Sequence, residues 1–254
     1  MVKISANLGF LWTDISLPLR IERAATAGFS AVECHFPYDH ESHDIAAVLG
    51  KHGVQMVGLN AGLGSGGKED FGVAARTGRE IEACELIDEA ITYAEAVGAS
   101  YVSVLAGRVS GRDAEQTYIQ NLSYACSRAC REGINVVIEP MSVSAAPGYF
   151  LNTVEQAVSI IETVDAPNMK LMFDCFHTQV DQGALTERLR RYSEHLGHVQ
   201  ISSVPDRAEP DTGEINYRHI FKVLDDLGYQ GWVGAEYHPN TTVEDGLAWL
   251  KEMV

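Results

Sequence analysis

Four side chains that offer oxygen ligands stand at the ends of four successive apolar segments of the chain. They are Glu139, Asp174, Gln200 and Glu236, separated by 35, 26 and 36 residues. Each interval is about the length of one strand-helix-strand unit, so the four side chains should converge at one end of a parallel sheet. Three carboxylates and an amide oxygen suit a hard divalent cation, and without one the carboxylates would repel each other. The sequence therefore predicts a Mg²⁺ or Mn²⁺ site made of these four residues.

Three further side chains are candidates for binding the substrate. His177 follows Asp174 by three residues and could lean over the same site, either to bond the substrate or to orient a ligand. Arg207 stands in a long polar segment, 204–217, and could grip a substrate carboxylate with two hydrogen bonds. Arg108 follows an apolar segment and is a second candidate for contact with an anion. A surface ion pair is the alternative role for either arginine.

A glycine-rich stretch lies at residues 62–72. It formally matches the GxGxxG pattern of nucleotide-binding turns, but Lys68 to Gly72 do not open a helix directly after it. A mobile cover needs backbone freedom and no nucleotide, so we expect this segment to be a lid over the site.

Short β-branched segments alternate with longer stretches of helical periodicity along the whole chain. Eight strands are expected, at 2–8, 31–36, 54–60, 100–106, 134–140, 169–174, 198–202 and 232–237, and eight helices, at 16–27, 42–52, 78–97, 115–132, 153–164, 183–195, 216–227 and 242–253. Thr153 and Gln156 have the spacing of a capping box at one helix start. Eight strand-helix units in 254 residues predict an α/β fold, a (β/α)8 TIM barrel, as a single domain over 1–254. A doubly wound open sheet is the rival, but it usually has fewer strands.

The amino-acid composition argues against nucleic acids and membranes as binding partners. The chain has 19 Lys and Arg against 35 Asp and Glu, a formal net charge of −16, which repels nucleic acid and anionic membranes. The absence of a leader-like start and of a long apolar stretch predicts a cytoplasmic protein. The five cysteines show no paired CxxC spacing, so neither a disulfide framework nor a zinc knuckle is expected.

The chain resembles the hydroxypyruvate isomerase group of the xylose-isomerase-like barrels, which also includes 2-oxo-tetronate isomerases and ketose 3-epimerases. Asp174-Cys175-Phe176-His177 is one of the segments that carry the resemblance. Three others together are fairly specific to this branch: Gly197-His198-Val199-Gln200-Ile201, Thr212-Gly213-Glu214-Ile215-Asn216-Tyr217 and Gly231-Trp232-Val233-Gly234-Ala235-Glu236-Tyr237. The resemblance implies the same four metal ligands, with Glu139 and Glu236 also acting as the catalytic acid/base pair. Gln200 separates this branch from the 3-epimerases, which tend to have histidine there.

The resemblance implies a metal-dependent isomerase that converts hydroxypyruvate and tartronate semialdehyde through an enediolate. A 2-oxo-tetronate isomerase and a ketose 3-epimerase are the alternatives within the same class, since the partner in each case is a small hydroxy-keto acid or sugar. A non-catalytic sugar-binding barrel and a barrel endonuclease for abasic sites are the alternatives from other classes. The acidic composition argues against the endonuclease. The sequence is also compatible with a homo-oligomer.

Overall fold

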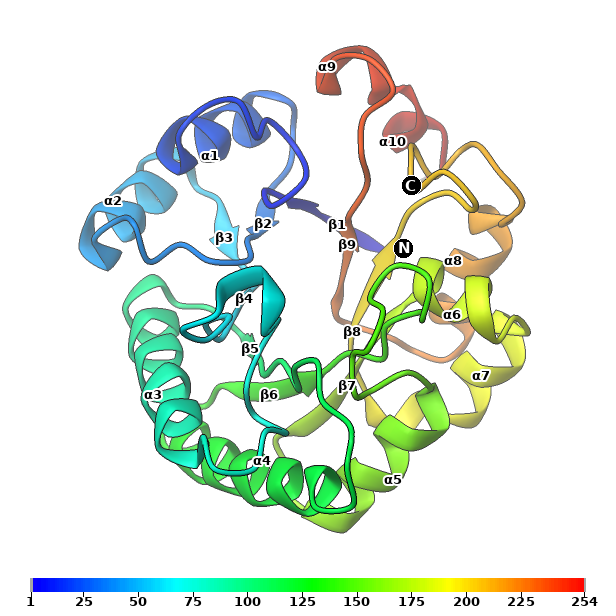
Figure 1. Cartoon of the computed structure of the whole chain (residues 1–254). Helices are drawn as coiled ribbons and strands as arrows, with labels where there is room; N and C mark the ends of the chain where they lie inside the picture. Colours follow the sequence, from blue (N-terminus) through cyan, green and yellow to red (C-terminus); the bar gives the residue numbers. More distant parts are fainter. Residues whose placement is uncertain (1, 254) are drawn as a thin grey trace.

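The computed structural model describes residues 2–253 and has a central ring of parallel strands surrounded by helices (Figure 1). Within this part of the chain the strands are β1 (Lys3–Asn7), β2 (Ala31–Glu33), β3 (Gln55–Met56), β4 (Gly58–Asn60), β5 (Tyr101–Ser103), β6 (Asn135–Ile138), β7 (Met169–Asp174), β8 (Leu196–Ile201) and β9 (Trp232–Ala235). Their order is β3-β2-β1-β9-β8-β7-β6-β5-β4, so the first strand pairs with the last. The predicted TIM barrel is confirmed.

The expected strand at 54–60 is divided at Val57. Its first part, β3, pairs with β2, and its second part, β4, pairs with β5. The amide of Cys34 donates to Gly58 O (3.2 Å) and the amide of Asn60 donates to His35 O (2.9 Å). These bonds join β4 to the chain just beyond β2, so β3 and β4 together form the third strand of the barrel and close the ring.

The helices form the outer ring in Figure 1. They are α1 (Leu17–Thr26), α2 (Ser42–His52), α3 (Glu80–Val97), α4 (Ala114–Cys130), α5 (Val154–Val164), α6 (Cys175–Asp181), α7 (Leu185–Arg191), α8 (Tyr217–Asp226), α9 (Val243–Gly246) and α10 (Ala248–Met253), with short 3₁₀ turns at Gly67–Glu69 and Ser193–His195. In α8 the buried residues Tyr217, Ile220, Phe221 and Leu224 recur at helical spacing, which packs one face of the helix on the barrel. Among the described residues no helix is long and apolar enough to cross a membrane.

Two of the predicted helices differ from the structure. The expected helix at 183–195 is α7 followed by a 3₁₀ turn, and a further helix, α6, begins directly after β7. The expected helix at 242–253 is divided into α9 and α10 at Leu247. The predicted cap of α5 is present in part, because Thr153 Oγ1 accepts from the amide of Gln156 (3.1 Å) while the Gln156 side chain accepts from the amide of Asn152 (3.1 Å).

Strand alternation decides which side chains face the inside of the barrel. A small buried cluster contains Ala31, Val57, Tyr101, Val137 and Met172. Successive side chains of a strand point to opposite faces, so the residue two positions further along faces the same way. Two positions after Ala31, Val137 and Met172 stand the acidic residues Glu33, Glu139 and Asp174. The apolar cluster is therefore the floor on which the polar site is built.

Candidate active site

A cavity of about 210 Å³ opens at the carboxyl ends of the strands, where TIM barrels carry their active sites. The predicted residues Glu139, His177, Gln200, Arg207 and Glu236 line it. Its apolar walls are formed by Phe10, Phe36, Phe71, Leu105, Met141, Ala145, Ala146 and Met172. Pockets for drug-sized ligands have volumes of about 300–1,000 Å³, so this cavity suits a smaller molecule.

Glu139, Asp174 and His177 form a buried cluster at the base of the cavity. One ligand atom from each lies within 4.8 Å of the others, a spacing that could hold a metal ion. Asp174 pairs in register with Gln200 on the neighbouring strand, which brings the predicted ligands of β7 and β8 side by side. Asp174 Oδ1 accepts from the amide of Phe176 (2.7 Å) at the start of α6, so Oδ2 is the oxygen that faces the site. The clustering of these residues agrees with the predicted convergence.

Arg207 joins the remaining carboxylate to this cluster. Its Nη2 donates to Asp174 Oδ2 (3.1 Å) and to Glu236 Oε2 (2.7 Å), and its Nη1 donates to His177 Nε2 (3.0 Å). A guanidinium only donates, so His177 Nε2 is the acceptor of this bond. His177 Nδ1 accepts from the amide of Ser142 (3.2 Å) and lies 3.0 Å from Ser142 Oγ. Arg207 thus gives the carboxylates the positive charge that their closeness requires.

The protein fixes Arg207 from its backbone as well as from its side chain. Its φ of 51° lies in the left-handed region, which residues other than glycine seldom adopt. Its amide donates to Ser203 O (3.0 Å) and its carbonyl accepts from the amide of His238 (2.8 Å). The guanidinium lies between the rings of Phe10 and Phe176, 4.9 and 4.8 Å from their centroids. Backbone strain that is held in this way is typical of functional sites.

The two glutamates of the site have opposite pKa shifts. Burial, and then repulsion by Glu236 and Asp174, raises the pKa of Glu139 well above its ordinary 4.5. Burial also raises the pKa of Asp174 to about 6, although Arg207 opposes this. Burial acts on Glu236 in the same direction, but Arg207 and His35 outweigh it and lower the pKa of Glu236 to about 2. Without a cation, one glutamate is therefore a proton donor and the other a base.

His177 is neutral in this environment. Burial, and then the charge of Arg207, lowers its pKa to about 3. Its Nε2 lies 3.5 Å from Asp174 Oδ2 and 3.7 Å from Glu139 Oε1. Nε2 accepts from Arg207, so the predicted hydrogen bond from a substrate hydroxyl to this nitrogen requires that Arg207 release it.

Several residues near the site were not predicted from the sequence. Glu236 Oε1 contacts His35 Nε2 (2.9 Å) and accepts from Asn7 Nδ2 (3.1 Å). The same Asn7 group donates to Glu33 (2.9 Å), which also accepts from Gln200 Nε2 (2.9 Å). Asn7 stands near the end of the expected strand 2–8, and that position was the available signal. Glu33 and His35 fall inside the expected strand 31–36, so no strand end marked them.

The residues present fit a divalent cation. The Oε1 atom of Gln200 is buried and has no hydrogen-bond partner within residues 2–253, although buried polar atoms are normally satisfied. It belongs to the same cavity as Glu139 and Glu236, and oxygen ligands of this kind suit Mg²⁺ or Mn²⁺. To reach both Asp174 Oδ2 and Glu236 Oε2, a cation would replace their contacts with Arg207.

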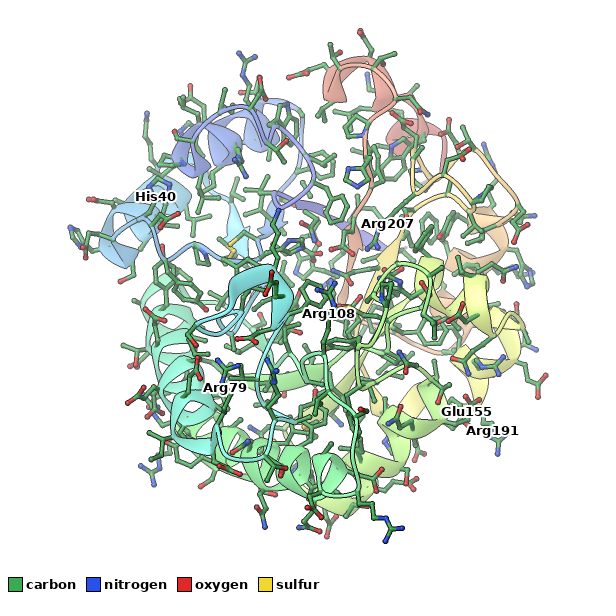
Figure 2. All side chains as sticks on the ribbon, in the orientation of Figure 1. His40, Arg79, Arg108, Glu155, Arg191 and Arg207 are labelled. Carbon is green, nitrogen blue, oxygen red and sulfur yellow. The ribbon has the colours of Figure 1, made fainter. Side chains whose placement is uncertain are left out.

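Arg108 does not line the cavity, unlike the other predicted substrate contacts. Figure 2 shows Arg108 and Arg207 near the middle of the barrel, whereas His40, Glu155 and Arg191 lie at the rim. Arg108 donates to Lys68 O, its amide donates to Asp70 O (2.8 Å), and its guanidinium lies 5.3 Å from the centroid of the Phe71 ring. Arg108 therefore contacts the predicted lid segment, residues 62–72, and Phe71 brings that segment to the cavity wall.

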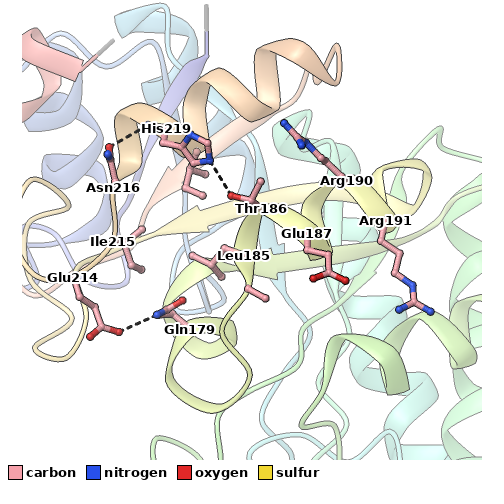
Figure 3. Close-up of a pocket in the computed structure, with 12 residues that line it drawn as sticks. Gln179, Leu185, Thr186, Glu187, Arg190, Arg191, Glu214, Ile215, Asn216 and His219 are labelled. Atoms are coloured by element: carbon pink, nitrogen blue, oxygen red, sulfur yellow. Dashed lines mark hydrogen bonds between the residues drawn. The ribbon is translucent and has the colours of Figure 1, made fainter.

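A larger groove of about 780 Å³ lies on the outer ring, between α7 and α8 (Figure 3). Its polar side chains bond to each other, with Gln179 donating to Glu214 (2.9 Å) and Thr186 lying 3.0 Å from His219 Nε2. It shares no lining residue with the barrel cavity. The larger of the two cavities is therefore not the candidate active site.

A barrel of this kind, with acidic residues gathered at the strand ends, defines a class of enzymes that act on small substrates, and comparison with known proteins gives the family. The family model described as xylose isomerase-like TIM barrel matches residues 21–253. The 2-oxo-tetronate isomerase of Cupriavidus necator is 39% identical over 99% of this chain and 98% of its own length. The hydroxypyruvate isomerase of Escherichia coli is 37% identical over 98% of both chains. The chain belongs to the xylose isomerase-like TIM barrel family, and the predicted resemblance is confirmed.

Solved structures agree with this assignment. A Brucella melitensis protein described as an AP endonuclease of family 2 has a TM-score of 0.96 and 38% identity, and the match covers 99% of both chains. A D-psicose 3-epimerase of Clostridium cellulolyticum has a TM-score of 0.80 at 17% identity over 93% of this chain and 85% of its own. At that identity, the second likeness supports the fold alone.

Proposed function

We propose that this protein is a metal-dependent isomerase that interconverts hydroxypyruvate and tartronate semialdehyde. The observation that carries the proposal is the pairing of Glu139 and Glu236, two buried glutamates with oppositely shifted pKa values in one small cavity. The isomerase names of the full-length relatives support the same reaction class. Residues 1–254 form a single barrel domain in this proposal.

In this proposal Glu139, Asp174, Gln200 and Glu236 hold Mg²⁺ or Mn²⁺. The cation, when bound, would polarise the substrate carbonyl and stabilise negative charge on its oxygen. One glutamate takes a proton from the carbon that bears the hydroxyl group, and the other glutamate gives a proton to the neighbouring carbon, which was the carbonyl carbon. The substrate passes through an enediolate, and no redox cofactor is needed because the two carbons exchange oxidation states within one molecule.

Arg207 and His177 bind the substrate in this account. Arg207 is the guanidinium that lines the cavity, and its two donor nitrogens match the two oxygens of a carboxylate. The neutral His177 ring offers its Nε2 to a hydroxyl group. The contacts of Arg108 support a different role for that residue, since it fastens the lid segment through Lys68, Asp70 and Phe71.

The experiment is a substrate panel with the purified protein, assayed with Mn²⁺, with Mg²⁺ and with a chelator. Turnover of hydroxypyruvate that requires the metal is the expected result. Faster turnover of a 2-oxo-tetronate would instead indicate a 2-oxo-tetronate isomerase, and C3 epimerisation of a ketose would indicate a ketose 3-epimerase. Binding of these compounds without turnover would indicate a sugar-binding barrel instead.

A duplex with an abasic site belongs in the same panel, because one similar structure is described as an endonuclease. The net charge of −16 predicts no cleavage.

The five cysteines are free thiols, which supports our further proposal of a cytoplasmic location.

A further inference from the structure

Glu33 is a buried carboxylate that the proposed reaction does not use. It ends β2 and is 2% exposed. Its Oε1 accepts from Asn7 Nδ2 (2.9 Å) and Gln200 Nε2 (2.9 Å). Its Oε2 accepts from Ser5 Oγ (3.1 Å) and Tyr101 (3.4 Å) and lies 2.6 Å from His198 Nε2. These partners come from β1, β5 and β8, so Glu33 spans the interior of the barrel below the site.

The bond to Gln200 determines which way the Gln200 amide points. An ionised carboxylate can only accept, so the NH₂ end of the amide must face Glu33. The oxygen end then faces away from Glu33, which agrees with the burial of Gln200 Oε1 and with its having no hydrogen-bond partner among residues 2–253. The opposite orientation would turn two N–H donors toward the site and would offer a cation no lone pair.

Asn7 links Glu33 to Glu236 and so also holds the Glu236 carboxylate in place. Its Nδ2 donates to both Glu33 Oε1 (2.9 Å) and Glu236 Oε1 (3.1 Å), and its Oδ1 accepts from the amide of Gly9 (2.8 Å). The Asn7 amide is therefore held at both ends. Two of the four proposed ligands, Gln200 and Glu236, depend on hydrogen bonds that meet at one oxygen of Glu33.

A glycine opposite Glu33 makes room for this arrangement. Gly234 pairs in register with Gln200, and a Cβ atom at Gly234 would lie 2.3 Å from Glu33 Oε1. A side chain there would push the carboxylate away from the amide that it orients. The chain thus places a glycine where β9 passes the Glu33 carboxylate.

We propose that Glu33 is a positioning residue, which turns the Gln200 amide so that its Oε1 is presented to the divalent cation. This inference rests on the proposed metal site. Groups that orient metal ligands typically contribute about 10–100-fold in metal affinity. Glu33 should therefore act on metal binding without touching the metal or the substrate.

The test is calorimetric titration with Mn²⁺ of the wild type and of Glu33→Met, Glu33→Gln and Gly234→Ala, each checked for folding by circular dichroism. Glu33→Met removes the acceptor at similar length and should weaken Mn²⁺ binding about 10–100-fold. Glu33→Gln can keep a carbonyl oxygen at the Oε1 position, so it should stay within about threefold of the wild type. Gly234→Ala should weaken binding in the same direction as Glu33→Met, and it decides the question if Glu33→Met does not fold.

Wild-type affinity in folded Glu33→Met or in Gly234→Ala would overturn the inference while leaving the proposed metal site intact. Equal losses in Glu33→Gln and Glu33→Met would also overturn it, because the charge rather than the acceptor would then matter. If the wild type binds no Mn²⁺, the proposed metal site itself fails, and this inference fails with it.

Discussion

Replacing Arg207 with methionine should destabilise the metal-free protein strongly. Arg207 bonds to Asp174, Glu236 and His177, and it is a main cause of the low pKa of Glu236. A shift of that pKa from 4.5 to about 2 corresponds to about 3 kcal/mol. Removing one partner from a buried ion pair typically costs about 3–5 kcal/mol, which agrees. For a chain of this size, the loss should lower the melting temperature by about 6–12 °C.

The sign of the pH dependence follows from the same shift. A lowered carboxyl pKa contributes stability that is present above the unfolded value of 4.5 and is lost as pH falls toward 2. The difference between Arg207→Met and the wild type should therefore be largest near about pH 7 and should shrink below about pH 4.

Differential scanning calorimetry without metal, at several pH values, measures this difference. Arg190→Met is the matched control, because Arg190 is exposed on α7 and should melt within about 1 °C of the wild type. Saturating Mn²⁺ should reduce the loss in Arg207→Met, since the cation supplies the missing positive charge. Melting of metal-free Arg207→Met within about 2 °C of the wild type at about pH 7 would refute the role assigned to this arginine.

Three further predictions concern proton release, the lid and a helix cap. Mn²⁺ binding should release protons, because burial raises the pKa of Glu139 and a bound cation favours its ionised form, and affinity should therefore rise with pH, by up to about tenfold per pH unit for each proton released. Calorimetry in buffers of different ionisation enthalpy measures this release, and an affinity that does not change with pH would contradict the prediction. Hydrogen exchange in the lid segment should slow when Mn²⁺ and hydroxypyruvate are both bound, whereas unchanged exchange would indicate a passive loop. Thr153→Ala should lower the unfolding free energy by about 1 kcal/mol in urea titrations, with exposed Thr163→Ala as the control, and an equal effect of both would exclude a specific cap.

Apolar strands and amphipathic helices made the barrel predictable from the sequence. The details that escaped prediction depend on pairing in space. The division of the third strand at Val57 reflects a change of partner from β2 to β5, which the local sequence does not encode. Helix α6 has only seven residues and begins at Cys175, directly after Asp174, which serves both as its N-cap and as a site carboxylate. Such a helix is too short for its periodicity to be recognised.

The candidate site was predictable where a polar residue ended an apolar strand. The spacing of Glu139, Asp174, Gln200 and Glu236 was enough to place them together. Glu33 and His35 lay within an expected strand at 31–36, so nothing marked them as strand ends. Their partners, Gln200 and Glu236, are 167 and 201 residues away in the sequence. The position of Arg207 among the carboxylates depends on a long loop, whose path the sequence does not specify.

The central claim is that Glu139 and Glu236 transfer protons beside a divalent cation, and kinetics of Glu139→Gln and Glu236→Gln with Mn²⁺ test it most directly. Glutamine keeps an oxygen ligand but cannot take up the proton. Each variant should lose at least about 10²-fold in kcat for hydroxypyruvate and keep Mn²⁺ affinity within about tenfold. Glu209→Gln, a buried glutamate that does not line the cavity, should turn over normally as the control. Turnover near the wild-type rate in either site variant would contradict the account.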